Sequence, residues 1–280
     1  MNGVLVVNKE KGYTSRDVVN IVSKILNTKK VGHTGTLDPI AEGVLVLTIG
    51  KCTKLGSLLT SSYKEYIAEF EIGYETDTLD NTGEVIKKSD KIVLQGDIEK
   101  IIESFKGVYN QEVPKYSAVK INGKKLYEYA RNNEEVSLPK REVDIKELDI
   151  LSINNNIIKI RCLVSKGTYI RSLIRDIGVS LGTYATMTSL VRTKLGDYSI
   201  EESYSLDDIK NNNYKLISVE EIFNNYPKVD MDDELYKKVI NGVVLDNIYN
   251  SLYVLFYYKD KLVCIYKEYE KSKIKMFVLL

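Results

Sequence analysis

The stretch of the chain that is richest in glycine and proline reads Gly32-His33-Thr34-Gly35-Thr36-Leu37-Asp38-Pro39-Ile40-Ala41-Glu42-Gly43. Three glycines and a proline within these twelve positions predict a tightly turned loop between two ordered elements. The Gly-Lys-Ser/Thr of a phosphate-binding P-loop is missing, and the glycine spacing is not that of a dinucleotide-binding fold. Composition alone favours a structural turn in which Asp38 caps backbone amides; the alternative is a loop that presents Asp38 for chemistry.

The segments around this loop mix strands and helices without a regular strand–helix–strand alternation. Alternating or continuous apolar residues predict strands, and apolar residues three and four positions apart predict helices. The predicted strands lie at 4–7, 44–47, 66–74, 142–153 and 156–164. The predicted helices are one that Ser15 caps and that extends to Ile25, one that begins at Asp97 and is closed by Gly107, and two more over 124–131 and 169–181. We therefore expect an α+β fold with a mixed, largely antiparallel sheet.

Charge is balanced over the whole chain but uneven along it. Lys and Arg number 40 and Asp and Glu 39 in 280 residues, a net charge of +1, so any surface for nucleic acid must be a local patch. Residues 105–192 hold 15 basic and 9 acidic side chains, whereas residues 197–235 hold 3 basic and 11 acidic ones. This change of sign marks a boundary in the chain.

The acidic segment leads into a C-terminal part that is rich in predicted strands. Two short helices capped by Ser205 and Ser218 are expected in the acidic segment itself. Beyond it the sequence predicts a helix at 232–241 and strands at 252–258, 262–267 and 273–280. We divide the chain into a large domain over residues 1–227 and a small β-rich domain over residues 228–280.

Rare residue types exclude several kinds of site. His33 is the single histidine, so a metal site with two histidines is ruled out, and any serine or cysteine nucleophile that needs histidine would depend on it. Cys52, Cys162 and Cys264 are odd in number and far apart, which favours three reduced, buried thiols over disulfides or a zinc site. The 21 tyrosines suit core packing and also base stacking.

Apolar runs are too short for a membrane protein. The longest covers the seven residues 252–258, whereas a membrane span needs about 20. The N-terminal run of residues 4–7 is too short for the core of a signal peptide. We expect a cytoplasmic protein that does not enter a membrane.

Two further segments carry polar side chains that suit chemistry or RNA binding. A strand is expected to end at Lys166-Gly167 and a helix to begin with Thr168 as its cap, which places Arg171 in the first turn. An arginine there opposes the helix dipole, so we expect a carboxylate or phosphate partner, with a surface salt bridge as the alternative. Residues 113–131 interleave basic and tyrosyl residues, which is typical of a surface for phosphates and bases and also of a solvated amphipathic helix.

In this order and spacing, these segments resemble the TruB family of tRNA pseudouridine synthases over about residues 3–196. The pattern Gly-His-Thr-Gly-x-Leu-Asp-x-x-Ala-x-Gly in residues 32–43 is highly specific for that family. Further landmarks are Lys64-Glu-Tyr66, Asp77-Thr-Leu-Asp80, Pro114-x-Tyr-Ser-Ala-x-Lys120, Ser165-Lys-Gly-Thr-Tyr-Ile-Arg171 and Leu190-Val-Arg-Thr193. Val46 and Lys115 stand where the family often has proline, and neither lies on an expected reacting group.

The resemblance implies a role for particular side chains. Asp38 is the expected nucleophile, Arg171 its ion-pair partner, and Tyr66 the ring that packs against the target uracil close to Asp38. The residues expected to bind the substrate are His33, Tyr66, Asp80, Lys166, Tyr169 and Leu190. Among them, Tyr169 and Leu190 would line the uracil pocket, and His33 would contact the displaced RNA.

The reaction implied by the resemblance is the isomerisation of uridine to pseudouridine at position 55, in the TΨC loop of tRNA. It breaks the N1–C1′ bond and rejoins the same uracil through C5, so we expect no cofactor, no metal and no obligatory protein partner. The C-terminal part is expected to be a PUA-like RNA-binding domain, with a structural appendage as the alternative. Two other functions stay open: a non-catalytic RNA-binding or tRNA-folding protein on this scaffold, and a guide-RNA-dependent synthase.

Overall fold

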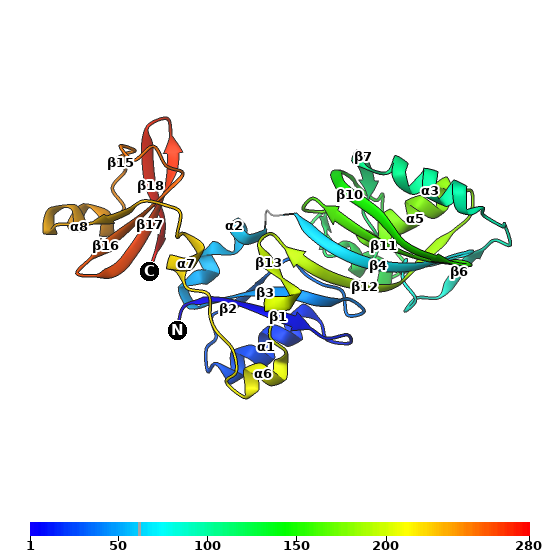
Figure 1. Ribbon diagram of the computed structural model, residues 1–280, viewed down its shortest axis with the longest axis horizontal. Helices are drawn as coiled ribbons and strands as arrows, with labels where there is room; N and C mark the ends of the chain where they lie inside the picture. Colours follow the sequence, from blue (N-terminus) through cyan, green and yellow to red (C-terminus); the bar gives the residue numbers. More distant parts are fainter. Residues whose placement is uncertain (61–62) are drawn as a thin grey trace.

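The computed structural model of the protein describes residues 1–60 and 63–280, and two large β-sheets dominate it (Figure 1). The strands of the larger sheet are β1 (Gly3–Lys9), β2 (Val31–Thr34), β3 (Glu42–Ile49), β4 (Lys64–Ile72), β7 (Gly107–Glu112), β10 (Lys140–Asn154), β11 (Ile157–Val164), β12 (Ala185–Leu195) and β13 (Tyr198–Ser199). They lie in the order β1-β3-β12-β4-β11-β10-β7, with β2 beside β3 and β13 beside β12. Strands β3 and β12 pair in parallel and the other neighbours antiparallel, which confirms the predicted α+β class with a mixed, largely antiparallel sheet.

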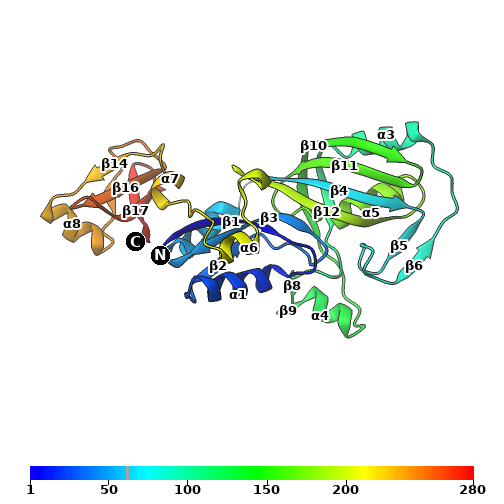
Figure 2. The same cartoon turned by 60° about the horizontal axis from the view of Figure 1, so that its bottom comes forward.

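Helices cover this sheet in separate groups. They are α1 (Ser15–Ile25), α2 (Gly56–Thr60), α3 (Gln95–Ser104), α4 (Leu126–Arg131), α5 (Ile170–Ser180), α6 (Leu206–Lys210), α7 (Val219–Ile222) and α8 (Asp233–Ile240), with 3-10 turns η1 (Gly50–Leu55) and η2 (Ile200–Glu202). Helices α1 and α6 pack against each other and against the first strands, with α1 beneath β1, β2 and β3 in Figure 2, whereas α3 and α5 pack on the half of the sheet that contains β10 and β12. Small hairpins pair β5 (Tyr74–Thr76) with β6 (Val85–Lys88), and β8 (Lys120–Ile121) with β9 (Lys124–Lys125).

Helix α5 is held against the sheet by one apolar face. Ile170, Ile174 and Ile177 recur at helical spacing and are at most 4% exposed. Burying a side chain of this kind stabilises the fold by about 1.5–3 kcal/mol. The packing of these residues fixes the first turn of α5, and that turn carries Arg171.

Some predicted boundaries differ from the structure at points where side chains have other partners. The cap of α1 is Thr14, not Ser15, because the Ser15 hydroxyl bonds to the backbone of Leu37 instead. Thr168 does not cap α5, because its hydroxyl donates to the Ser165 carbonyl at 2.9 Å. The predicted loop at 32–43 is shorter than expected, since residues 32–34 belong to β2 and pair with residues 46–48 of β3, while residues 42 and 43 already belong to β3.

Helix α3 lies two to three residues closer to the N-terminus than the helix predicted for this segment. It was expected to begin at Asp97 and close at Gly107, but α3 begins at Gln95 and ends at Ser104. Gly107 instead opens β7, with the positive φ of +99° that a glycine adopts without strain.

The second sheet is formed by the C-terminal residues and lies at one end of the molecule (Figure 1). Its strands are β14 (Lys228–Asp230), β15 (Leu245–Asp246), β16 (Tyr253–Tyr258), β17 (Lys261–Glu270) and β18 (Lys273–Leu279), in the order β14-β16-β17-β18-β15. The expected β-rich C-terminal domain is therefore confirmed as a fold. One face of this sheet shares an apolar core with β1 and β3, in which Val4 and Val46 join Leu255 and Ile265.

Membrane-spanning helices and metal-binding clusters are both absent from the part of the chain that the structure describes. Within residues 1–60 and 63–280, no helix has both the length and the apolar character needed to cross a membrane. In the same described part of the chain, no three His, Cys, Asp or Glu residues come together in a way that could hold a metal ion.

Candidate active site

The loop between β2 and β3 presents Asp38 next to strand β12. Gly43 pairs with Arg192 across the parallel β3–β12 contact, and its φ is +97°. A Cβ atom at Gly43 would lie 2.3 Å from the Arg192 carbonyl oxygen, so only glycine allows the strands to approach this closely. On the other side, the buried Ser15 hydroxyl accepts from the Leu37 N–H at 2.9 Å. These two contacts fix the backbone on both sides of Asp38.

Asp38 forms an ion pair with Arg171 from helix α5. Arg171 Nη2 lies 2.8 Å from Asp38 Oδ2, and the two side chains are 5% and 38% exposed. Arg171 also donates to the carbonyl oxygens of Thr78 at 2.9 Å and Tyr116 at 3.1 Å. The guanidinium is thus held from several directions in one orientation, while the carboxylate of Asp38 stays accessible from the pocket.

The pocket beside Asp38 is a cavity of about 290 Å³ with an aromatic and cationic lining. Of the residues predicted from the sequence, Tyr66, Lys166, Tyr169 and Leu190 line it together with Asp38 and Arg171. Burial raises the pKa of Tyr66, while the neighbouring charge of Arg192 acts in the opposite direction. Tyr66 therefore offers the pocket a neutral phenol ring, which suits stacking on a base.

Buried cations lie around this pocket, and none of them was assigned a role from the sequence. Arg192 is fully buried and donates to the carbonyl oxygens of Val44 at 2.7 Å and Gly35 at 3.0 Å. Lys64 and Arg192 both line the pocket, and burial lowers the pKa of Lys64 to about 8. Burial also lowers the pKa of Lys9 to about 8. These cations give the pocket a positive field that favours an anionic ligand.

A signal for Lys64 and Arg192 was present in the strand pattern. Burial alternates along β4, so that Lys64 shares the inward face with Tyr66 and Ala68. In β12, Arg192 likewise occupies the inward position that follows Leu190. A charged residue in register with buried apolar residues is unusual enough to mark a candidate site.

Two predicted substrate-binding residues lie outside the lining of the pocket. His33 is on β2, and its Nδ1 is buried without a hydrogen-bond partner among the described residues. Burial, followed by the charges of Arg16 and Arg192, lowers the pKa of His33 and favours the neutral ring. Asp80 is 5% exposed, and its Oδ2 lies 3.8 Å from Nη1 of Arg171, whereas Asp38 contacts Nη2. A substrate contact by either residue stays a prediction.

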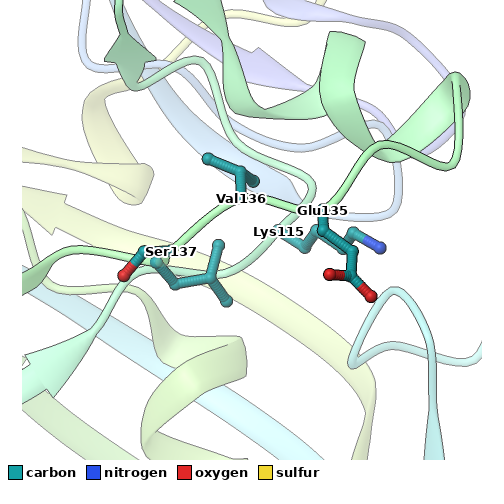
Figure 3. A pocket seen from close by; sticks show the side chains of 5 residues that line it. Lys115, Glu135, Val136 and Ser137 are labelled. Carbon is teal, nitrogen blue, oxygen red and sulfur yellow. The ribbon is translucent and has the colours of Figure 1, made fainter.

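A second hollow lies near the segment that precedes β10 (Figure 3). It is larger, about 540 Å³, and Lys115 and residues 135–138 line it. Its charged side chains, Lys115 and Glu135, are opposite in sign, and none of the predicted site residues is part of the lining. The pocket beside Asp38 is therefore the candidate active site.

Comparison with known proteins shows that the chain belongs to the TruB family of pseudouridylate synthases. The model for the N-terminal domain of that family matches residues 23–170, and the model for the C-terminal domain of tRNA pseudouridylate synthase B matches residues 171–236. The family expected from the sequence motifs is confirmed.

Relatives in bacteria match over most of their length. The protein named tRNA pseudouridine synthase B of Fusobacterium nucleatum is 46% identical over 272 residues, which are 94% of each chain. The protein of that name in Bacillus subtilis is 42% identical over 259 residues, or 88% of this chain and 84% of the relative. This chain is thus similar to tRNA pseudouridine synthase B enzymes over most of its length.

Solved structures of similar fold come from larger assemblies. A chain in the structure of an H/ACA RNP bound to a substrate RNA containing 2′-deoxyuridine has a TM-score of 0.69 and 26% identity, covering 99% of this chain and 83% of that one. A chain in a Cbf5–Nop10–Gar1 complex has a TM-score of 0.70 and 26% identity, covering 99% and 84%. The similarity extends over the whole arrangement of the two sheets.

Proposed function

We propose that this protein isomerises uridine to pseudouridine at position 55, in the TΨC loop of tRNA. The observation that carries the proposal is the ion pair of Asp38 and Arg171 at 2.8 Å, at a pocket lined by Tyr66, Tyr169 and Leu190. A carboxylate held by a guanidinium stays ionised and oriented, as a nucleophile requires. The tRNA specificity is supported by the bacterial relatives named tRNA pseudouridine synthase B.

In the proposed reaction, Asp38 attacks the bound nucleotide at ribose C1′ or at uracil C6. The N1–C1′ bond breaks, the uracil turns within the pocket, and a C5–C1′ bond forms as Asp38 is released. C5 loses its proton to solvent and N1 takes up a proton, so the product has the same composition as the substrate. The reaction needs a nucleophile and a confined pocket, and no oxidant, reductant or external group.

The size and lining of the pocket support a flipped-out uridine as substrate. A base inside a folded RNA loop must leave its stack before it can reach a carboxylate in a cavity of about 290 Å³. Tyr66 and Tyr169 would stack on the displaced uracil, with Leu190 packing on its other side. We assign His33 to the RNA that the uridine leaves and Lys166 to the adjacent backbone.

The remaining RNA surface in this proposal is the basic segment around β8, β9 and α4. Lys124 lies 4.6 Å from the ring centre of Tyr129, and Arg131 lies 5.4 Å from that of Tyr127. Cations stacked on tyrosines form a surface that can bind phosphates and bases at once. We also assign RNA binding to the C-terminal sheet, with residues 228–280 as a domain of their own and no obligatory protein partner.

The test uses an unmodified tRNA transcript that carries tritium at uracil C5. Pseudouridine formation releases this label into water, whereas binding of the tRNA alone does not. We expect stoichiometric release from a single uridine, and a transcript with cytidine at position 55 should release none. Binding of the tRNA without release of the label would support the non-catalytic RNA-binding protein instead and refute the proposed activity.

A further inference from the structure

Gln111 lies at the end of β7, behind helix α5, and is only 1% exposed. Its Oε1 accepts a hydrogen bond from the Tyr169 N–H at 2.7 Å, and its Nε2 donates to the Tyr169 carbonyl oxygen at 3.1 Å. One side chain therefore holds both backbone groups of one residue. Gln111 is not part of the pocket lining and does not face the substrate.

The amide of Gln111 is itself held in a single orientation. Nε2 also donates to the Tyr109 hydroxyl at 2.6 Å, and that hydroxyl lies 3.5 Å from Asp176 Oδ2. Reversing the amide would place its donor group against the Tyr169 N–H, which is also a donor. Burial raises the pKa of Tyr109, so its hydroxyl stays protonated and can donate to Asp176.

Tyr169 is the position at which such a clamp has most effect on the site. It is the N-cap of α5, where backbone N–H groups lack partners inside the helix, and its own side chain makes no capping hydrogen bond. Its ring lines the pocket instead. Two residues further on, Arg171 reaches Asp38 at 2.8 Å. The backbone of Tyr169 thus connects the stacking surface to the ion pair.

We propose that Gln111 is a positioning residue for the isomerisation. By clamping the main chain of Tyr169, it sets the ring of Tyr169 in the uracil pocket and directs Arg171 toward Asp38. This inference rests on the proposed function, because it assigns to Gln111 an effect on turnover. Gln111 acts only through these residues and contributes nothing to RNA affinity.

Ser172 offers a matched control for this inference. Its hydroxyl donates to the Glu112 carbonyl oxygen at 2.8 Å, and the side chain is fully buried. This bond joins the same two elements, β7 and α5, but it does not touch Tyr169. Loss of the Ser172 bond weakens the packing of the helix on the strand and leaves the clamp in place.

The first experiment compares Gln111→Leu with Ser172→Ala in single-turnover tritium release at saturating tRNA. We expect Gln111→Leu to be roughly ten- to a hundredfold slower, as for a small misplacement of reacting groups, with a tRNA Kd within about twofold of wild type. Ser172→Ala should turn over at close to the wild-type rate. A wild-type rate in Gln111→Leu, or an equal loss in both variants, would overturn the inference. A wild-type protein without activity would instead refute the proposed function.

A second variant tests the clamp even if Gln111→Leu does not fold. In Gln111→Glu, the protonated carboxyl can accept from the Tyr169 N–H and donate to its carbonyl oxygen, whereas the carboxylate repels that carbonyl. Burial raises the pKa of a carboxyl at this position. The rate of this variant relative to wild type should therefore fall as the pH is raised from about 5.5 to about 8.5. A ratio that is independent of pH would contradict the clamp.

Discussion

Replacing Arg171 by lysine separates the geometry of the ion pair from its charge. The guanidinium of Arg171 is 5% exposed and bonds in three directions, to Asp38, to the carbonyl of Thr78 and to the carbonyl of Tyr116. Lysine keeps the positive charge but carries its donors on one atom, so it cannot span these partners. The Arg171→Lys variant therefore loses contacts while the net charge of the pocket stays the same.

The size of the effect follows from the contacts that are lost. Each buried partner left without a hydrogen bond costs about 1–3 kcal/mol, and the bond to a charged group such as Asp38 lies at the upper end of that range. If lysine turns toward the carbonyl oxygens, the loss at Asp38 is about 2–3 kcal/mol, or roughly a thirty- to hundredfold slower reaction. We expect tRNA affinity to change little, because distributed phosphate contacts provide most of it.

The assay is single-turnover tritium release at saturating tRNA, with Arg175→Lys as the control. Arg175 lies one turn further along α5 and makes a similar set of bonds, to Glu112 at 3.0 Å and to Asp176 at 2.8 Å. It does not touch Asp38, so its lysine variant should react at close to the wild-type rate. A rate for Arg171→Lys within about threefold of wild type, or an equal loss in Arg175→Lys, would refute the ion pair as the feature that orients Asp38.

Three further outcomes are expected. Asp38→Asn should abolish turnover but leave tRNA affinity within a few-fold, since it removes the proposed nucleophile and keeps the shape; turnover within about tenfold of wild type would exclude Asp38 as the nucleophile. Burial lowers the pKa of Lys64 to about 8, so its ammonium charge is lost as the pH rises from about 7 to about 9. The affinity for tRNA should therefore fall more over that range in wild type than in Lys64→Met. Equal pH profiles of the two proteins would show that the charge of Lys64 does not contribute to RNA binding. Ending the chain after Tyr226 should lower the melting temperature, because buried valines of β1 and β3 become exposed, and each exposed side chain costs about 1.5 kcal/mol or more of folding free energy. An unchanged melting temperature would show that the C-terminal sheet does not stabilise the larger sheet.

The sequence was most informative where function depends on a short motif. Residues 32–43 and the segment ending in Arg171 predicted the loop and the helix that the structure brings together at the ion pair. It was least informative for the residues that hold these groups in place. Gln111 and Tyr169 are 58 positions apart, and their contact exists only because β7 packs beside α5. No local propensity or spacing encodes such a contact.

Predicted strands were accurate where alternation or apolar runs were long. The runs at 252–258 and 156–164 correspond to β16 and β11 with shifts of one residue at an end. Helix starts were accurate at Ser205 and Ser218, which cap α6 and α7 as predicted, and less accurate where a serine or threonine near the start has a competing partner. Ser15 shows this competition directly, since its hydroxyl fixes the backbone of Leu37 while Thr14 caps the helix.

The continuous apolar run at residues 4–7 has a consequence for how the two sheets depend on each other. A strand with one face in water alternates apolar and polar residues, so a run without polar residues indicates cover on both faces. In β1, Leu5 and Val7 belong to the core under α1, whereas Val4 and Val6 belong to the core shared with the C-terminal sheet. The same division occurs in β3, the strand that follows the Asp38 loop. The C-terminal sheet therefore supports the strand that follows the Asp38 loop, even though it contributes no residue to the lining of the pocket.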